Sequence, residues 1–213
     1  MRITAALWPA ICFTLATGCA QLGTRKDRER LVAANPRSIV IVPVMNKSVD
    51  VDAPDYFLST LAVPLAERGY YVFPVNAVKR LLEDDGLADP GVVHRADPAR
   101  LGALFGADAI LYVTIEKWTA KYLVVSTKVE VEFEYVLKDG RDGAELWRHR
   151  ERMDYVASSG DSLIVALVSA ALTKASPNYM PLARKANDTA FAWPGPGLPA
   201  GPYRPEHGKD FSE

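Results

Sequence analysis

The stretch Ser38-Ile39-Val40-Ile41-Val42-Pro43-Val44 is the part of the chain that decides the fold. It contains a run of β-branched residues that no polar residue interrupts, so it lacks the alternation of a strand with one solvated face. A continuous apolar run of this length is typical of a strand covered on both faces. We therefore expect a core strand here, with helices on either side of its sheet.

The segments after this strand alternate between helical and extended patterns. Residues 54–68 have apolar positions four apart and stop before Gly69, and Pro64 is expected to kink or divide this helix. Residues 70–73 predict a second buried strand, and the apolar positions from Val75 to Leu82 predict a second amphipathic helix that ends in Asp84-Asp85-Gly86. A strand, helix, strand order with short joints implies that the two strands pair in parallel.

Further along, a loop is expected to continue to about residue 96. Asp97-Pro98 then supplies an N-cap and a first-turn proline for a helix that ends at Gly106. Residues 109–115 form the third core strand of the prediction. The apolar residues of the helix before it are expected to face inward; they are Leu101, Leu104 and Phe105.

The second half of the chain predicts a long antiparallel hairpin. Residues 124–137 alternate, a turn cluster follows, and residues 144–156 are again extended. If Lys138 pairs with Ala144, the register gives three charge pairs and one aromatic pair: Glu130 with Arg152, Glu132 with Arg150, Glu134 with Arg148, and Tyr135 with Trp147.

Two features of this hairpin leave alternatives open. The glutamates could form a carboxylate cluster for acid and base chemistry or for calcium, although pairing with the arginines is the favoured interpretation. His149 and Glu151 would share the apolar face, which indicates either a bulge or a face that is only partly covered. Taken together, the patterns predict an α/β fold: a mixed sheet with a parallel βαβ first half and a long antiparallel hairpin, with helices packed on the sheet.

The amino-terminal segment predicts an export signal that ends at a lipidated cysteine. A charged start at Arg2 is followed by an apolar core, too short to span a bilayer, and by Leu15-Ala16-Thr17-Gly18-Cys19. A lipoprotein signal peptidase needs small residues before the cut and a thiol after it. We expect diacylglycerol on the Cys19 sulfur and an acyl chain on its freed amine, which together anchor the chain firmly in a bilayer. An ordinary secretory signal or a buried helix with an incidental cysteine is the alternative.

Four segments follow from these patterns. Residues 1–18 are the signal peptide, residues 19–36 a lipidated tether, residues 37–192 a single α/β domain, and residues 193–213 a tail rich in proline and glycine. The other cysteine, Cys12, lies in the segment that would be removed, so no disulfide is expected in the mature chain. The 25 basic and 26 acidic residues nearly cancel, and a nucleic-acid partner is not expected.

The residues offer little for catalysis. The three histidines, His94, His149 and His207, fit no metal-ligand spacing, and the chain has no nucleophile elbow, phosphate loop or dinucleotide fingerprint. We therefore predict a protein that is not an enzyme and needs no cofactor or metal. The best position for a small-molecule cleft is the loop after the first strand, because open α/β sheets bind ligands there. Its polar residues are Asn46, Ser48 and Asp50, and the alternative is that they only hold their own turn.

Two apolar or aromatic regions are candidate interfaces. Residues 162–172, including Leu163 and Leu167, predict a helix that is apolar nearly all round and buried in the monomer, with contact to a second copy as the alternative. A shorter helix is expected after Pro177, running to Phe191. The tail after it is predicted to be extended or disordered and offers Trp193 and Tyr203 as docking residues.

Several segments resemble a family of Gram-negative lipoproteins of unknown function. They are Ile39 to Ser48 (IVIVPVMNKS), Pro64 to Pro74 (PLAERGYYVFP), Gly106 to Trp118 (GADAILYVTIEKW) and Gly201-Pro202-Tyr203. That family is similar in fold to the amino-terminal domain of the TolB translocation protein and to the curli-secretion lipoprotein. The resemblance implies a periplasm-facing adaptor at the outer membrane and brings no catalytic residues.

The function predicted on these grounds is that of a lipoprotein anchored in the outer membrane through Cys19. It would act as a non-enzymatic accessory in an envelope assembly or transport complex, with other envelope lipoproteins or proteins as partners and a homodimer as a further expectation. Two alternatives stay open: an activator of a cell-wall synthase, and a ligand-binding or enzymatic domain that uses the loop after the first strand.

Overall fold

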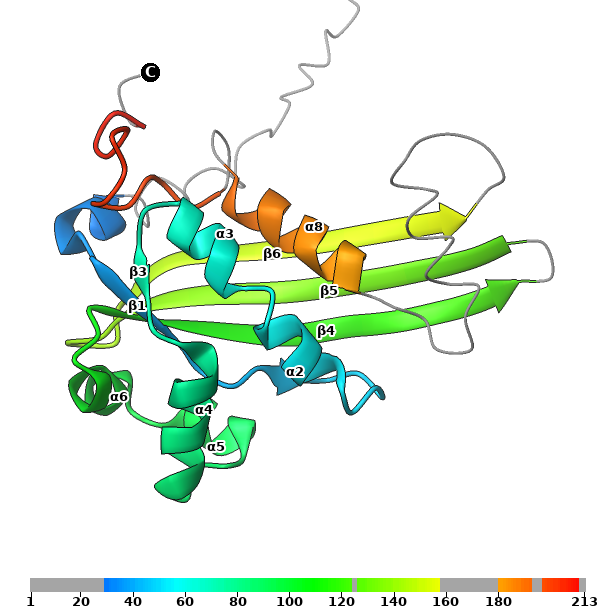
Figure 1. Ribbon diagram of the computed structural model, residues 1–213, viewed down its shortest axis with the longest axis horizontal. Coiled ribbons are helices and arrows are strands. Elements are labelled where there is room, and N and C mark those ends of the chain that lie inside the picture. Colours follow the sequence, from blue (N-terminus) through cyan, green and yellow to red (C-terminus); the bar gives the residue numbers. More distant parts are fainter. Residues whose placement is uncertain (1–28, 124–125, 158–179, 193–196, 211–213) are drawn as a thin grey trace, which may run out of the picture.

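The computed structural model describes residues 29–123, 126–157, 180–192 and 197–210 (Figure 1). A short helical segment at residues 29–34 leads into the first strand. The elements that follow are β1 (Ser38–Ile41), β2 (Met45–Asn46), α2 (Ala53–Leu58), α3 (Ala62–Glu67), β3 (Tyr71–Val72), α4 (Val75–Asp84), α5 (Pro90–Arg95), α6 (Pro98–Phe105), β4 (Ala109–Leu123), β5 (Ser126–Asp139), β6 (Glu145–Ala157) and α8 (Met180–Phe191).

The strands form one mixed sheet in the order β3-β1-β4-β5-β6, and β2 also pairs with β4. Strands β1, β2 and β3 lie in the parallel part, where β1 pairs in parallel with both β3 and β4. Strands β4, β5 and β6 form the antiparallel part. The predicted mixed sheet, with a parallel first half and a long hairpin, is therefore confirmed.

Alternate residues of the central strands enter two separate cores, as the continuous apolar run predicts. Ile39 and Ile41 of β1 face the core beneath α2, α3 and α8, whose helices lie across one face of the sheet (Figure 1). Val40 and Val42 face the second core, which α4, α5 and α6 complete. Residues 39–42 are all buried. Covering both faces explains why this stretch tolerates no polar residue.

The register of the hairpin differs from the prediction by two residues: the turn shifts it by one, because Lys138 pairs with Glu145 instead of Ala144, and a bulge adds the second. Lys138 pairs with Glu145, but Leu137 pairs with Trp147, so Leu146 is the extra residue. Leu146 and Trp147 are adjacent and both buried in the same core, which an unbroken strand could not allow because neighbours point to opposite faces. From Trp147 onward the shift is an even number of residues, so those side chains keep their predicted face, whereas Leu146, expected opposite Val136, faces the same core as Trp147.

The helix expected over residues 54–68 is divided into α2 and α3 before Pro64, as predicted, because a proline cannot donate to the carbonyl four residues earlier and its ring clashes with it. Two other predictions need correction. The second strand is not buried: β3 has two residues, lies at the sheet edge and leaves Tyr71 53% exposed. Leu104 is 45% exposed, whereas Leu101 faces inward as predicted.

Two further segments are more ordered than the sequence suggests. Residues 90–95 of the expected loop form helix α5, where the Asp89 carboxylate caps the chain by accepting from the Val92 amide at 2.9 Å. The predicted third strand continues past residue 115 to Leu123, with a bulge near Glu116 that keeps both Ile115 and Trp118 in the same core. The antiparallel part is thus a meander of three long strands instead of a single hairpin.

Candidate functional site

The loop between β2 and α2 holds the three polar residues predicted to line a ligand cleft. The Asn46 side-chain amide donates to the Asp50 carbonyl at 2.7 Å, and its oxygen accepts from the Ser48 amide at 2.9 Å and hydroxyl at 2.7 Å. The Asp50 carboxylate accepts from the amides of Asp52 and Ala53 at 3.0 and 3.2 Å. These polar groups bond within the loop, which is the alternative that the sequence left open. That this loop binds a small molecule stays a prediction.

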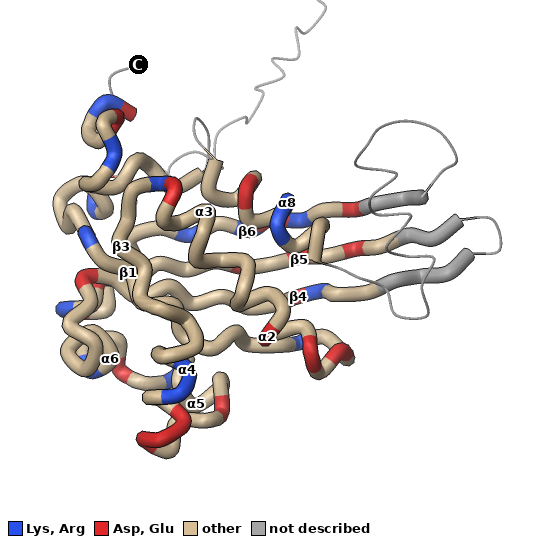
Figure 2. The backbone as a smooth tube through the Cα atoms, in the orientation of Figure 1, with Lys and Arg blue, Asp and Glu red and all other residues tan. Residues whose placement is uncertain are grey.

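What this loop presents to solvent is apolar. Val49 and Val51 lie on either side of Asp50 and are 93% and 85% exposed, the highest values among the large apolar residues that are described. Asp50 and Asp52 are their neighbours in sequence, and Figure 2 shows acidic residues in the segment next to α2. A hydrogen-bonded frame that holds two valines in water is a surface suited to contact with another apolar surface.

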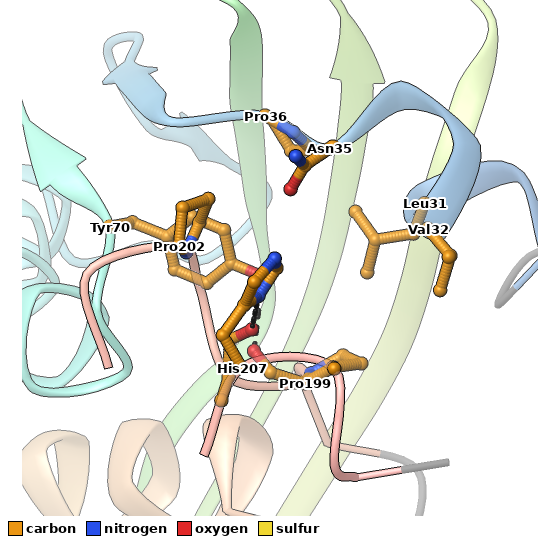
Figure 3. A pocket seen from close by; sticks show the side chains of 10 residues that line it. Leu31, Val32, Asn35, Pro36, Tyr70, Pro199, Pro202 and His207 are labelled. Carbon is orange, nitrogen blue, oxygen red and sulfur yellow. Dashed lines mark hydrogen bonds between the residues drawn. The ribbon is translucent and has the colours of Figure 1, made fainter. Parts of the chain in front are cut away.

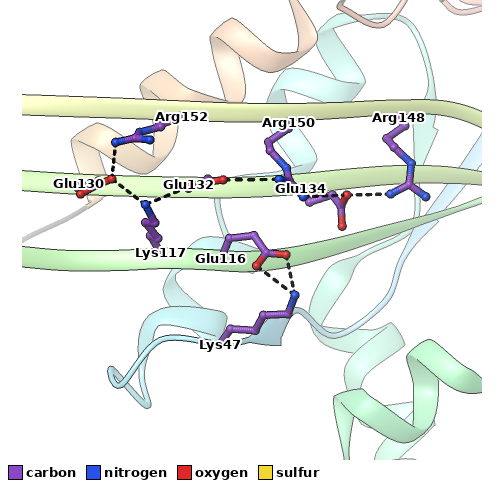
Figure 4. Close-up of polar contacts among 9 residues, drawn as sticks. All are labelled: Lys47, Glu116, Lys117, Glu130, Glu132, Glu134, Arg148, Arg150 and Arg152. Atoms are coloured by element: carbon purple, nitrogen blue, oxygen red, sulfur yellow. Dashed lines mark hydrogen bonds and ion pairs between the residues drawn. The ribbon is translucent and has the colours of Figure 1, made fainter. Parts of the chain in front are cut away.

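The face of the sheet that α4, α5 and α6 leave open carries a ladder of charges (Figure 4). Arg148 donates to Glu134 at 2.8 Å, and Arg152 lies 2.7 Å from Glu130. The predicted pairs are thus found, although they now connect diagonal positions because of the bulge. The glutamates are flanked on the other side by Lys117, whose amine lies 3.0 Å from Glu130.

Charge pairing shifts the pKa values of two groups beside the glutamates. The hydrogen bond to Glu130 raises the pKa of Lys117, and the hydrogen bond from Arg148 lowers the pKa of Glu145. Both shifts keep the groups charged at neutral pH. The arrangement therefore serves to keep this face of the sheet polar and paired.

Residues 197–210 of the carboxyl-terminal tail pack against the domain, whereas the sequence predicted an extended or disordered segment. The Gly201 amide donates to the Arg68 carbonyl at 2.7 Å, and the buried Tyr70 hydroxyl donates to the Pro199 carbonyl at 3.0 Å. Burial raises the pKa of Tyr70. A Cβ on Gly201 would lie 2.3 Å from the Gly69 carbonyl oxygen, so only glycine allows these two segments of the chain to cross here.

This tail closes an apolar pocket at the amino ends of β1 and β3 (Figure 3). Leu31 and Val32 form one wall, and Tyr70 forms another. Asn35 has a φ of 42° and its amide donates to the Leu31 carbonyl at 2.9 Å, a left-handed cap that turns the chain from the wall into β1. The remaining lining comes from Pro36 and from five residues of the tail, namely Pro199, Ala200, Pro202, His207 and Gly208.

Each histidine is held by a structural contact. His94 Nε2 lies 3.0 Å from the Pro43 carbonyl oxygen, and burial lowers its pKa. His149 Nε2 lies 3.0 Å from Glu151 Oε2, so the two residues whose shared face was puzzling bond to each other. His207 Nδ1 lies 2.8 Å from the Ala200 carbonyl oxygen. Within the described ranges, no three His, Cys, Asp or Glu residues are grouped so that they could hold a metal ion.

The remaining predicted site residues are not brought together. Cys19, Leu163, Leu167 and Trp193 lie outside the described residues, as does the whole apolar stretch at residues 162–172. Tyr203 is 67% exposed, and its amide donates to the Gly69 carbonyl at 3.1 Å. In the part of the chain that the structure describes, no helix is long and apolar enough to cross a membrane.

Sequence reasoning missed both the valine pair and the pocket. The alternation of valine with aspartate at residues 49–52 was available as a signal, since apolar residues in a polar loop have no core to enter. The pocket had no such signal, because its walls come from residues near 31, 70 and 200.

Comparison with known proteins gives consistent results. The family described as "Putative lipoprotein GNA1162-like" matches residues 26–191. "Putative lipoprotein NMB1124/NMB1162" of Neisseria meningitidis is 34% identical over 142 residues, which are 66% of this chain and 66% of that protein. The chain therefore spans slightly less than two thirds of this relative's length.

Solved structures agree with this relationship. The crystal structure of lipoprotein GNA1162 from Neisseria meningitidis has a TM-score of 0.57 and 31% sequence identity, covering 64% of this chain and 95% of that one. A PelC dodecamer from Paraburkholderia phytofirmans has a TM-score of 0.48 and 15% identity, covering 78% of this chain and 90% of that one. The TM-score of the PelC match is below 0.5, so we base no inference about this chain on it.

Proposed function

Because the chain belongs to the family described as "Putative lipoprotein GNA1162-like", we propose that it is an outer-membrane lipoprotein, anchored through Cys19, that acts as a non-enzymatic docking module in an envelope complex. The order of Arg2, the apolar core and Leu15 to Cys19 supports the anchor. The lipoprotein family supports the envelope location in general, and the outer membrane is our more specific assignment.

The observation that carries the docking role is the loop with Val49 and Val51. Both valines are almost fully exposed, and the bonds among Asn46, Ser48 and Asp50 fix the loop before any partner arrives. An ordered loop loses little conformational freedom on binding, so more of the free energy gained by burying the valines is retained. A catalytic role would instead need polar groups that converge on a cavity, whereas those of this loop bond to one another.

A photo-crosslinking amino acid at position 51 of the full chain, expressed in cells, tests this proposal. We expect illumination to give covalent products with a membrane-associated envelope protein, which includes another copy of this chain. The matched control places the same probe at Val63 of α3, another exposed valine. Products at position 51 that do not exceed those at position 63 would show that the loop is not a docking surface.

A further inference from the structure

The loop and the pocket described above are complementary in chemistry. The pocket is an apolar cavity of about 140 Å³, walled by Leu31, Val32 and Tyr70 together with prolines. An apolar cavity of about 150 Å³ holds a benzene molecule, which has as many carbon atoms as two isopropyl groups. The cavity is thus of the right size to receive the side chains of Val49 and Val51.

The two features lie at opposite ends of one line of strands. Asn35 and Pro36 of the pocket immediately precede β1, and the valines follow β2. Both strands run parallel to β4, with Ile39 opposite Ala109 and Met45 opposite Thr114. These strands therefore hold the loop and residues 29–36 of the same copy at opposite ends (Figure 1). A chain cannot fill its own pocket with its own valines.

The charges beside the two features are complementary at one position. Asp52 follows Val51, and its side chain forms no ion pair with the described residues. At the pocket, Arg37 follows Pro36; its amide donates to the Asp108 carboxylate at 2.9 Å, and its guanidinium forms no ion pair with the described residues. Arg30, which precedes Leu31, acts instead on Glu145, whose pKa it helps to lower. An acidic loop that approaches the Arg37 guanidinium is steered toward it and fixed in register. The same acidity disfavours an anionic lipid surface as the occupant.

We infer that the loop of one copy, through Val49 and Val51, seats in the pocket of a second copy of this chain. This inference rests on the proposed docking function and names its partner. Because the two surfaces are different, the contact is heterologous and each copy retains one free loop or one free pocket. Association therefore continues beyond two copies, into a ring or an open row.

Paired cysteines test this arrangement in membranes from cells that express the full chain. One variant carries both Val51→Cys and Val32→Cys, and a short bismaleimide links thiols that come together. We expect dimers, trimers and larger products from the double variant alone. The single variants and the wild-type chain, which reports on Cys12 and Cys19, are the controls. A Val51→Cys chain that forms dimers by itself would overturn the inference, since it would indicate a symmetric contact.

Removal of the apolar side chains provides a second measurement. In the double-cysteine background, Val49→Asp should lower the yield of trimers and larger products at least about tenfold, because loss of one buried valine exceeds the free energy that corresponds to that factor. Val63→Asp, the same substitution at an exposed valine of α3, should leave the yield unaltered. Equal effects of the two substitutions would overturn the inference.

The photo-crosslinking products at position 51 separate this inference from the proposed function. Products whose masses are multiples of this chain support both. Products with a different envelope protein alone overturn the second copy as partner and leave the docking function standing. No product above the position 63 control overturns both.

Discussion

Tyr112 carries a buried hydroxyl that has no hydrogen-bond partner among the described atoms. Its ring meets His94 edge-on at 5.2 Å between centroids, and the Lys138 amine lies 5.1 Å from the ring centroid. The ring is therefore useful to packing, whereas the hydroxyl has lost its hydration without compensation. Such a group costs about 1–3 kcal/mol.

Tyr112→Phe is accordingly expected to raise the free energy of unfolding, by about 1 kcal/mol. Burial also raises the pKa of Tyr112 to about 12, so the unfolded chain loses this proton first and stability falls as the pH rises from about 10 to about 12. The Phe variant should lose less stability over that range. Urea unfolding at about pH 7 and about pH 11 measures both effects. A lower stability of the variant at neutral pH would contradict the prediction.

Asn187 shows the opposite situation, a buried side chain whose oxygen and nitrogen each have a hydrogen-bond partner. The Tyr135 hydroxyl donates to its Oδ1 at 2.8 Å, and its Nδ2 donates to Thr60 Oγ1 at 2.7 Å. All three residues are buried. The network joins α8 to β5 and to the joint between α2 and α3, so it fixes where α8 rests on the sheet.

Asn187→Ala should lower the free energy of unfolding by about 2 kcal/mol, because the Tyr135 hydroxyl is left buried and unpaired. The exposed neighbour Asp188 provides the control, and Asp188→Ala should change stability by less than about 0.5 kcal/mol. Combining Asn187→Ala with Tyr135→Phe should cost less than the sum of the single changes, since both partners are then absent. Additive costs from urea unfolding would show that the two residues do not depend on each other.

At the scale of elements, the packed tail is the feature with the clearest energetic consequence. Leu198 is buried, while Tyr203 in the same segment is largely exposed. Leu198→Ala should therefore cost about 2–4 kcal/mol of unfolding free energy, whereas Tyr203→Ala should cost less than about 0.5 kcal/mol. Thermal or urea unfolding of the two variants compares them directly. Similar small effects from both would mean that the tail does not contribute to the fold.

The elements also show how far local pattern determines this fold. The β1 run, helices α4 and α6 and the faces of the hairpin were predictable, because each depends on a short apolar period or on a cap such as Asp97-Pro98. Helix α5 was equally accessible, since Asp89-Pro90 repeats that signal. The hairpin register could not be predicted, because the sequence pattern does not indicate which residue is the extra one in a bulge.

The β2–α2 loop and the pocket also differ in whether their contacts are local in sequence. The polar bonds of the β2–α2 loop join neighbours in sequence, so the sequence could suggest them as the alternative to a ligand site. The tail depends on Gly201 crossing Gly69, a contact between residues far apart in the chain. No local sequence pattern predicts this contact, so sequence reasoning missed the pocket that the tail closes.

At the scale of the whole molecule, the anchor is the prediction with the largest effect. Cys19→Ser removes the thiol that would receive diacylglycerol, so the precursor should remain uncleaved or the product should become soluble. Membrane fractionation and the intact mass of the chain measure the two outcomes. Cys12→Ser is the matched control and should leave both unchanged, because residue 12 lies in the segment expected to be removed. An unaltered membrane fraction and mass for Cys19→Ser would contradict the anchor.

The helical segment at residues 29–34 and the docked tail lie at the same end of the domain (Figure 1). If Cys19 holds the lipid, ten residues join the bilayer to residue 29, and such a stretch reaches at most about 36 Å. The domain is then held close to the membrane. Two copies meet by diffusing in the plane of the bilayer, in two dimensions instead of three. Such confinement raises the local concentration of each copy around its neighbours, so a contact as small as two valines and one pocket becomes sufficient where a free protein would need a larger interface.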